Sequence, residues 1–137
     1  MKVKNKKIIY IFTIILITLI TMKSYAREIG QLTNFSITGH SIHRTGFLLK
    51  QKDGHYIMNL NKGPNHRRNI KVRHRMVNYY GEARSPWRLT SEGDRHPCAN
   101  NATKGYTYAL DITRQYAWDG LETVNGSWSP ENQEGEW

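Results

Sequence analysis

The stretch from Lys71 to Tyr80 constrains the fold of this chain most, because its side chains alternate in character at every second position. Successive side chains of a β-strand point to opposite faces. Val72 and Met76 therefore share one face. Arg73 and Arg75 share the other. The stretch predicts an amphipathic strand, with one face against a hydrophobic core and the other facing water or an anion.

Other segments also predict strands. A longer alternation from Tyr106 to Trp118 predicts a half-buried strand of about a dozen residues. Gln31–Ile42 is expected to form a first strand with a break near Gly39, and Leu121–Val124 a short edge strand. Proline and glycine interrupt any periodic pattern in residues 82–105, which we expect to be a long connection without regular structure.

The Asp53-Gly54 pair predicts a tight hairpin between residues 47–52 and 55–60, because both residues tolerate the positive φ that such a turn needs. Residues at equal distances from the turn face one another across the hairpin. The expected apolar face then contains three pairs: Phe47 with Leu60, Leu49 with Met58, and Gln51 with Tyr56. Lys50 falls on the opposite, polar face.

These patterns together predict an all-β fold, a single small domain of about five strands. Long strands with one apolar face need closure or a second layer, so a curled sheet or a partly closed barrel is expected. In the number and length of its strands, the segment from Gln31 to Trp118 resembles an OB-fold, a small barrel used by exported binding proteins. Residues 61–69 are too short for the helix that an OB-fold usually places there.

The first 26 residues are excluded from the domain. Four lysines precede an Ile- and Leu-rich run that ends near Ser24-Tyr25-Ala26, which is typical of a secretory signal peptide with its helix. The run is shorter than the roughly 20 residues of a spanning helix, so the membrane is expected to be reached only through an uncleaved signal. We expect a β domain over residues 27–120 and an acidic tail over residues 121–137, in which Trp128 and Trp137 are exposed or docked. The expected location is bacterial, periplasmic or secreted.

Net charge limits the kinds of partner that we expect, and cysteine content limits the disulfides that can form. The net charge of +9 falls to +4 after residue 26, where 15 basic side chains face 11 acidic ones. This balance argues against a nucleic-acid partner. The charge is segregated, however, with the bases gathered between Arg44 and Arg88 and only acids after Asp119. Cys98 is the only cysteine, so no intramolecular disulfide can form.

The basic strand and the loop before it form the candidate ligand-binding site. Alternating Arg and Lys can hold phosphate or sulfate groups, and a nearby aromatic ring can stack on a sugar or a base. The expected ligand-binding residues are Arg67, Arg68, Lys71, Arg73, Arg75, Tyr79 and Trp87. The favoured function is a non-enzymatic exported binding protein for an anionic glycan, a lipid headgroup or a protein. The structural alternative is a solvated outer face that discourages edge pairing.

Two other functions remain open from the sequence. His74, with Arg75 and Glu82, has the residue types that a small secreted nuclease or toxin uses for acid-base cleavage. His74 also falls on an apolar strand face, where a hydrogen-bonded structural histidine is commoner. The third reading is a subunit of a cell-envelope or secreted assembly. The His40 and His43 pair lacks further ligands at a metal-site spacing, so we expect no metal, cofactor or catalytic centre.

Overall fold

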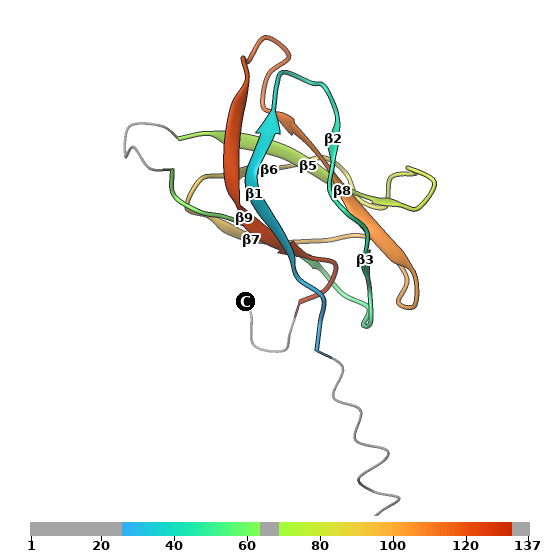
Figure 1. The fold of residues 1–137 in the computed structure, drawn as a ribbon. Coiled ribbons are helices and arrows are strands. Elements are labelled where there is room, and N and C mark those ends of the chain that lie inside the picture. Colours follow the sequence, from blue (N-terminus) through green and yellow to red (C-terminus); the bar gives the residue numbers. More distant parts are fainter. Residues whose placement is uncertain (1–25, 64–68, 133–137) are drawn as a thin grey trace, which may run out of the picture.

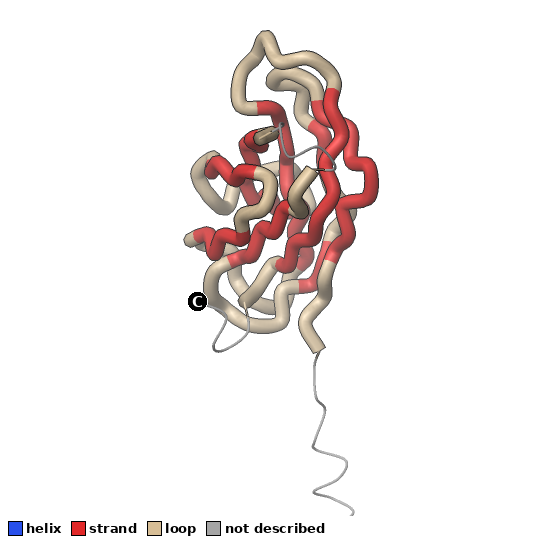
Figure 2. The backbone as a smooth tube through the Cα atoms, turned by 90° about the vertical axis from the view of Figure 1, so that its left-hand side faces the viewer, coloured by secondary structure: helices blue, strands red, loops and turns tan. Residues whose placement is uncertain are grey.

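The computed structural model describes residues 26–63 and 69–132 (Figure 1). The predicted signal segment up to residue 25 and the loop cations Arg67 and Arg68 lie outside these residues. The described part is all-β, and Figure 2 shows strands and loops in it without a helix. No helix long and apolar enough to cross a membrane occurs in it.

In the described part of the chain, nine strands form two antiparallel sheets, where the sequence predicted about five strands in one curled sheet or barrel. The first sheet has the order β1-β9-β4-β7. The second has the order β2-β8-β5-β6, and β3 also pairs with β8. The strands are β1 (Gly30–Ile37), β2 (His43–Arg44), β3 (Leu48–Leu49), β4 (Tyr56–Leu60), β5 (Lys71–Asn78), β6 (Arg88–Ser91), β7 (Arg95–Cys98), β8 (Thr107–Arg114) and β9 (Glu122–Ser129).

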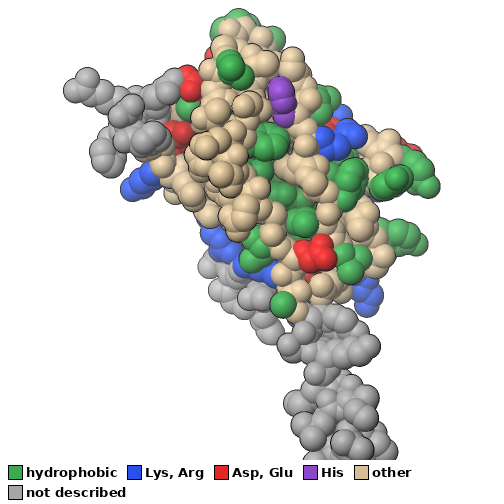
Figure 3. Space-filling model, in the orientation of Figure 1, with side chains coloured by type: hydrophobic (Ala, Val, Ile, Leu, Met, Phe, Trp, Pro, Cys, Tyr) green, Lys and Arg blue, Asp and Glu red, His purple; other side chains and the backbone are tan. Residues whose placement is uncertain are grey.

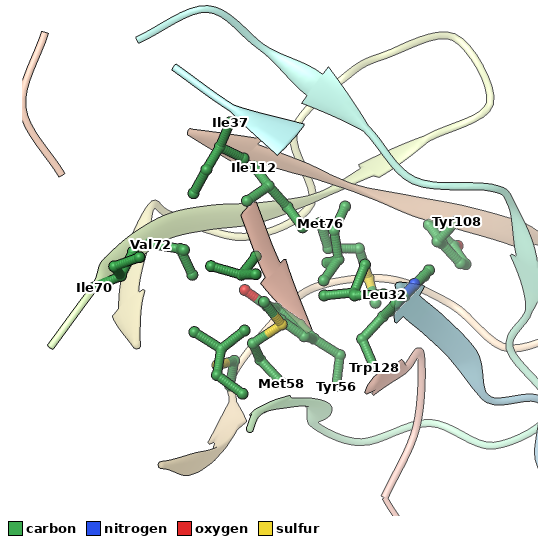
Figure 4. Packing of buried hydrophobic residues seen from close by; sticks show 14 of the residues in the cluster. Leu32, Ile37, Tyr56, Met58, Ile70, Val72, Met76, Tyr108, Ile112 and Trp128 are labelled. Carbon is green, nitrogen blue, oxygen red and sulfur yellow. The ribbon is translucent and has the colours of Figure 1, made fainter. Parts of the chain in front are cut away.

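The hydrophobic core lies between the two sheets. Figure 4 shows Tyr56, Met58 and Trp128 of the first sheet with Met76 and Ile112 of the second. All five side chains are buried, and burial of this much apolar surface is the main favourable term in folding. The core therefore holds together strands that share no hydrogen bonds.

The alternation of β5 is confirmed. Val72 and Met76 are buried in the core, whereas Arg73 and Arg75 are half-buried on the outer face. Its neighbour β8 is buried on both faces, and its outer face carries the buried Asp111. That strand ends at Arg114, earlier than predicted. Tyr116 and Trp118 instead stack on each other, exposed, in the following loop.

The predicted hairpin is wrong. Leu48 pairs with Tyr108 of β8, whereas β4 pairs with β7 and β9 of the other sheet. Gly54 does have a positive φ of 132°, so the chain turns where expected, but it crosses between the sheets there. In the first half of the predicted hairpin the faces are exchanged as well, because Lys50 is fully buried and Leu49 is half-buried. Carbonyl groups that accept hydrogen bonds from the Lys50 ammonium make this burial possible. In the second half, Tyr56, Met58 and Leu60 are buried as the sequence predicted.

Two segments for which the sequence predicted no regular structure, or only a short edge strand over residues 121–124, belong to the sheets. Residues 82–105 contain β6 and β7, which lie at the edges of the two sheets. The expected acidic tail contains β9, which lies between β1 and β4, and Trp128 on it is only 2% exposed. The domain therefore extends at least to the buried Glu131 instead of ending at residue 120.

Candidate functional site

The cations of the basic strand are engaged with the protein itself. Asp111 on β8 lies opposite Arg75 on β5 and Arg44 on β2, so the three side chains form a row across the outer face. Arg44 Nε is 2.6 Å from Asp111 Oδ1, and an Arg75 guanidinium nitrogen is 3.5 Å from Oδ2. The hydrogen bond to Asp111 raises the pKa of Arg44. This row neutralises part of the predicted basic face.

Trp87 lies with Arg73 and Arg75, as the sequence predicted. The guanidinium carbons of the two arginines are 4.3 and 4.5 Å from the centroid of the Trp87 ring, within the range of cation–π contacts. Arg73 Nε also donates a hydrogen bond of 3.1 Å to Thr113 Oγ1. The Trp87 ring is thus occupied by guanidinium groups, and half-buried Lys71 lies at the start of the same strand.

Tyr79 belongs to a different site. It lies just beyond the end of β5, where its ring is 5.5 Å from that of Phe47 and 5.6 Å from that of Tyr80. The Tyr79 and Tyr80 rings are nearly perpendicular, at 89°. Tyr79 is 69% exposed and Tyr80 is 82% exposed, and such exposure is unusual for side chains this large and apolar.

These two tyrosines border a hollow of about 410 Å³, which we name the tyrosine pocket. Its volume lies within the roughly 300–1,000 Å³ typical of small-molecule sites. Its other walls come from the loop after β5 and from the segment that leads into β8. On the right-hand side of Figure 3, hydrophobic side chains gather over these two segments. The lining residues are Asn78, Tyr79, Tyr80, Arg84, Asn101, Thr103, Tyr106, Thr107 and Tyr108.

Hydrogen bonds fix the β5 side of the pocket. Asn78 Oδ1 accepts bonds from the backbone N–H groups of Tyr80 and Glu82, at 3.1 and 2.8 Å. Gly81 has a φ of 80°, a left-handed conformation that glycine adopts without strain. This turn holds Tyr79 and Tyr80 in place before any ligand arrives.

The β8 side is fixed in the same way. The Tyr108 hydroxyl donates a 2.9 Å bond to the Thr103 carbonyl and accepts one of 3.0 Å from the Thr103 N–H. The Asn101 N–H donates to the Arg84 carbonyl at 2.8 Å, which joins the two walls. A preformed pocket loses less conformational entropy on binding.

His74 is a structural histidine. It is fully buried, with Nδ1 2.8 Å from the Tyr56 hydroxyl and Nε2 2.7 Å from Thr90 Oγ1. Burial, helped by the nearby positive charges of His96 and Arg88, lowers the pKa of His74 to about 3. The His74 imidazole is neutral, and both of its nitrogens are hydrogen-bonded inside the core. It has no access to a substrate phosphodiester, so it cannot act as the general base of the nuclease that the sequence suggested.

The remaining candidate groups lie apart from the pocket. Cys98 is a buried free thiol whose pKa is raised by desolvation, which does not favour a nucleophile. His40 Nε2 is 3.1 Å from the Gln115 carbonyl. Among residues 26–63 and 69–132, no three His, Cys, Asp or Glu side chains are grouped as a metal site would require.

Sequence reasoning identified Tyr79 but missed the residues that face it. Tyr80 and Tyr106 were assigned to strand faces, although each lies next to a glycine, Gly81 and Gly105, that has a positive φ. An aromatic residue beside such a glycine sits in a turn, where it is exposed. This local signal could have indicated the pocket.

The chain was also compared with known proteins in three ways. No family model, no curated protein and no solved structure matches it.

Proposed function

We propose that this protein is a non-enzymatic binding protein, exported from a bacterial cell to the periplasm or beyond, that engages an anionic glycan through the tyrosine pocket. One observation carries the proposal: Tyr79, Tyr80 and Tyr106 are 69%, 82% and 65% exposed and converge on one preformed hollow. Large aromatic side chains are costly to leave in water, and such clusters mark binding sites. The export part rests on the N-terminal sequence alone.

The chemistry of the pocket favours a sugar over a nucleobase. The perpendicular rings of Tyr79 and Tyr80 form a corner, whereas stacking of successive bases needs a row of accessible ring faces. A corner suits a thick, non-planar sugar ring whose C–H groups pack on the aromatic faces. The amide of Asn101 and the hydroxyl of Thr107 line the same pocket and can bond sugar hydroxyl groups.

The proposed class of function is the one expected from the sequence, but the surface that contacts the ligand is a different one. Arg73 and Arg75 contact Trp87, and Arg75 also contacts the buried Asp111, so their donor groups are partly used. Within residues 26–63 and 69–132, no Arg or Lys lies over the ring of Tyr79, Tyr80 or Tyr106. We therefore assign direct ligand contact to the tyrosine pocket and only long-range attraction to the basic strand.

The test is a binding measurement with matched variants. The purified protein is titrated with a panel of acidic and neutral oligosaccharides by calorimetry. Tyr79→Ala and Tyr106→Ala should each weaken binding about tenfold or more, because loss of one aromatic stacking contact costs roughly 1–3 kcal/mol. Trp118→Ala is the control, because Trp118 is 80% exposed and does not line the pocket. Equal losses in all three variants, or tighter binding of a single-stranded oligonucleotide than of any glycan, would contradict the proposal.

A further inference from the structure

A second hollow adjoins the tyrosine pocket. It has a volume of about 310 Å³, and we name it the arginine pocket for Arg84 and Arg88 in its lining. Arg84 and Asn101 line both hollows. The hydrogen bond from the Asn101 N–H to the Arg84 carbonyl joins the loops that carry them. The two hollows are therefore neighbouring compartments along one surface.

The arginine pocket offers positive charge that the described protein does not neutralise. Arg88 is exposed at the start of β6, and no carboxylate within residues 26–63 and 69–132 forms an ion pair with it. A guanidinium nitrogen of Arg84 is 3.4 Å from Glu82 Oε2, and both side chains of this ion pair are accessible to solvent. Exposed pairs of this kind contribute little, so a ligand can replace Glu82 at small cost.

We propose that the arginine pocket holds the acidic group of a sugar unit next to the one in the tyrosine pocket, so that the ligand is an acidic oligosaccharide. This inference rests on the proposed function and adds the position of the charge. A guanidinium group binds a carboxylate or sulfate through paired N–H donors, a geometry that a neutral sugar cannot use. Arg88 sets the preference for acidic glycans, and the tyrosines provide affinity for the sugar ring itself.

The test uses two pairs of probes with the full chain. Tetragalacturonic acid is compared with its methyl ester, and a heparin tetrasaccharide is compared with its desulfated form. We expect at least one acidic probe to bind at least tenfold more tightly than its neutral partner. Arg88→Gln should abolish that preference, whereas Arg88→Lys should keep part of it.

Lys62→Gln is the matched control, because it removes the same charge from an exposed side chain near Gly93, beyond the far end of β6. It should leave the preference intact. A preference that survives Arg88→Gln, or that falls equally in Lys62→Gln, would overturn this inference. If this inference fails but Tyr79→Ala still weakens binding of all probes, the proposed function stands without the role of the arginine pocket. Failure of all four probes to bind would contradict both.

Discussion

Lys50 is a charged side chain that is fully buried. Its Nζ donates hydrogen bonds to the carbonyls of Gly54 at 2.8 Å and Pro130 at 2.5 Å. Desolvation lowers the pKa of the ammonium, and the carboxylates of Glu131 and Asp53 oppose that shift. Glu131 itself accepts hydrogen bonds from the backbone N–H groups that follow Lys50. Lys50 thus ties the end of β9 to the crossing between the sheets.

Lys50→Asp should be far more destabilising than Leu49→Asp. The new carboxylate would lie beside carbonyl oxygens and the buried Glu131, and breaking a buried charge pair costs about 3–5 kcal/mol. Leu49 is only half-buried, so an aspartate there can reach water. Urea denaturation of the two variants measures the difference. A larger loss for Leu49→Asp would support the hairpin predicted from the sequence and contradict this structure.

His74 should make the stability of the protein depend on pH. Its folded-state pKa of about 3 lies below the ordinary value of 6.5, so the unfolded chain binds a proton between these values and the folded chain does not. Stability that is present above pH 6.5 is therefore lost as the pH falls toward 3. One such group gives a slope of at most about 1.4 kcal/mol per pH unit.

The measurement is the free energy of unfolding between pH 4 and 7. His74→Gln should be less stable at pH 7, because Gln cannot replace both hydrogen bonds, but its stability should fall less steeply with acid. Equal slopes for the wild type and His74→Gln would contradict the lowered pKa of His74.

Among the elements, β9 shows how closely the strands of the first sheet approach. Gly126 lies opposite Leu60 of β4 and Leu32 of β1. A Cβ atom at position 126 would lie 2.1 Å from the Asn59 carbonyl oxygen, a distance that no relaxation of a side chain can relieve. Glycine is required there because two backbones touch.

Gly126→Ala should therefore destabilise the protein by about 1–3 kcal/mol, the usual cost of an overpacked core. Gly120→Ala is the control, because a Cβ atom there would meet no other atom within 4 Å. Thermal unfolding of both variants checks the difference. If Gly126→Ala were as stable as the control, β9 would not lie where the structure places it.

The sequence predicted the strands that carry a clear contrast between their faces. In β5 the contrast is between core residues and arginines, and the structure confirms it. Which strands pair with each other was harder to predict from the sequence. Leu49 and Met58 fit a hairpin as well as they fit two different sheets, because local alternation does not state which strand lies next to which.

Short or polar strands gave little signal of their own. The segment Arg88–Ser91 forms a strand because it pairs with β5. The sequence indicated only a short strand over residues 121–124, and β9 extends to Ser129 because β1 and β4 flank it. Tertiary contacts override weak local preference in such cases. The same limit applies to the site. Trp87 lies near Arg73 because the neighbouring strands β5 and β6 pair, whereas Tyr79 and Tyr106 line one pocket because of the alignment of β5 and β8.

At the scale of the whole molecule, two sheets bury the core, and the loops at one end of the central strands β5 and β8 carry Tyr79, Tyr80 and Tyr106 (Figure 1). Asn78 at the end of β5 pairs with Tyr108 near the start of β8, which brings the two tyrosine-bearing loops together. A rigid scaffold that presents fixed loops is the usual arrangement for recognition. The tyrosine pocket is therefore the place where we expect the ligand to bind.

Nuclear Overhauser contacts between the protein and its bound glycan test this claim most directly. The spectrum is recorded with the glycan that binds most tightly, present in saturating amount. The account predicts contacts from the ring protons of Tyr79 and Tyr106 to C–H protons of one sugar unit. Contacts to the exposed rings of Tyr116 and Trp118 instead, or to Trp87 on the basic strand, would contradict it.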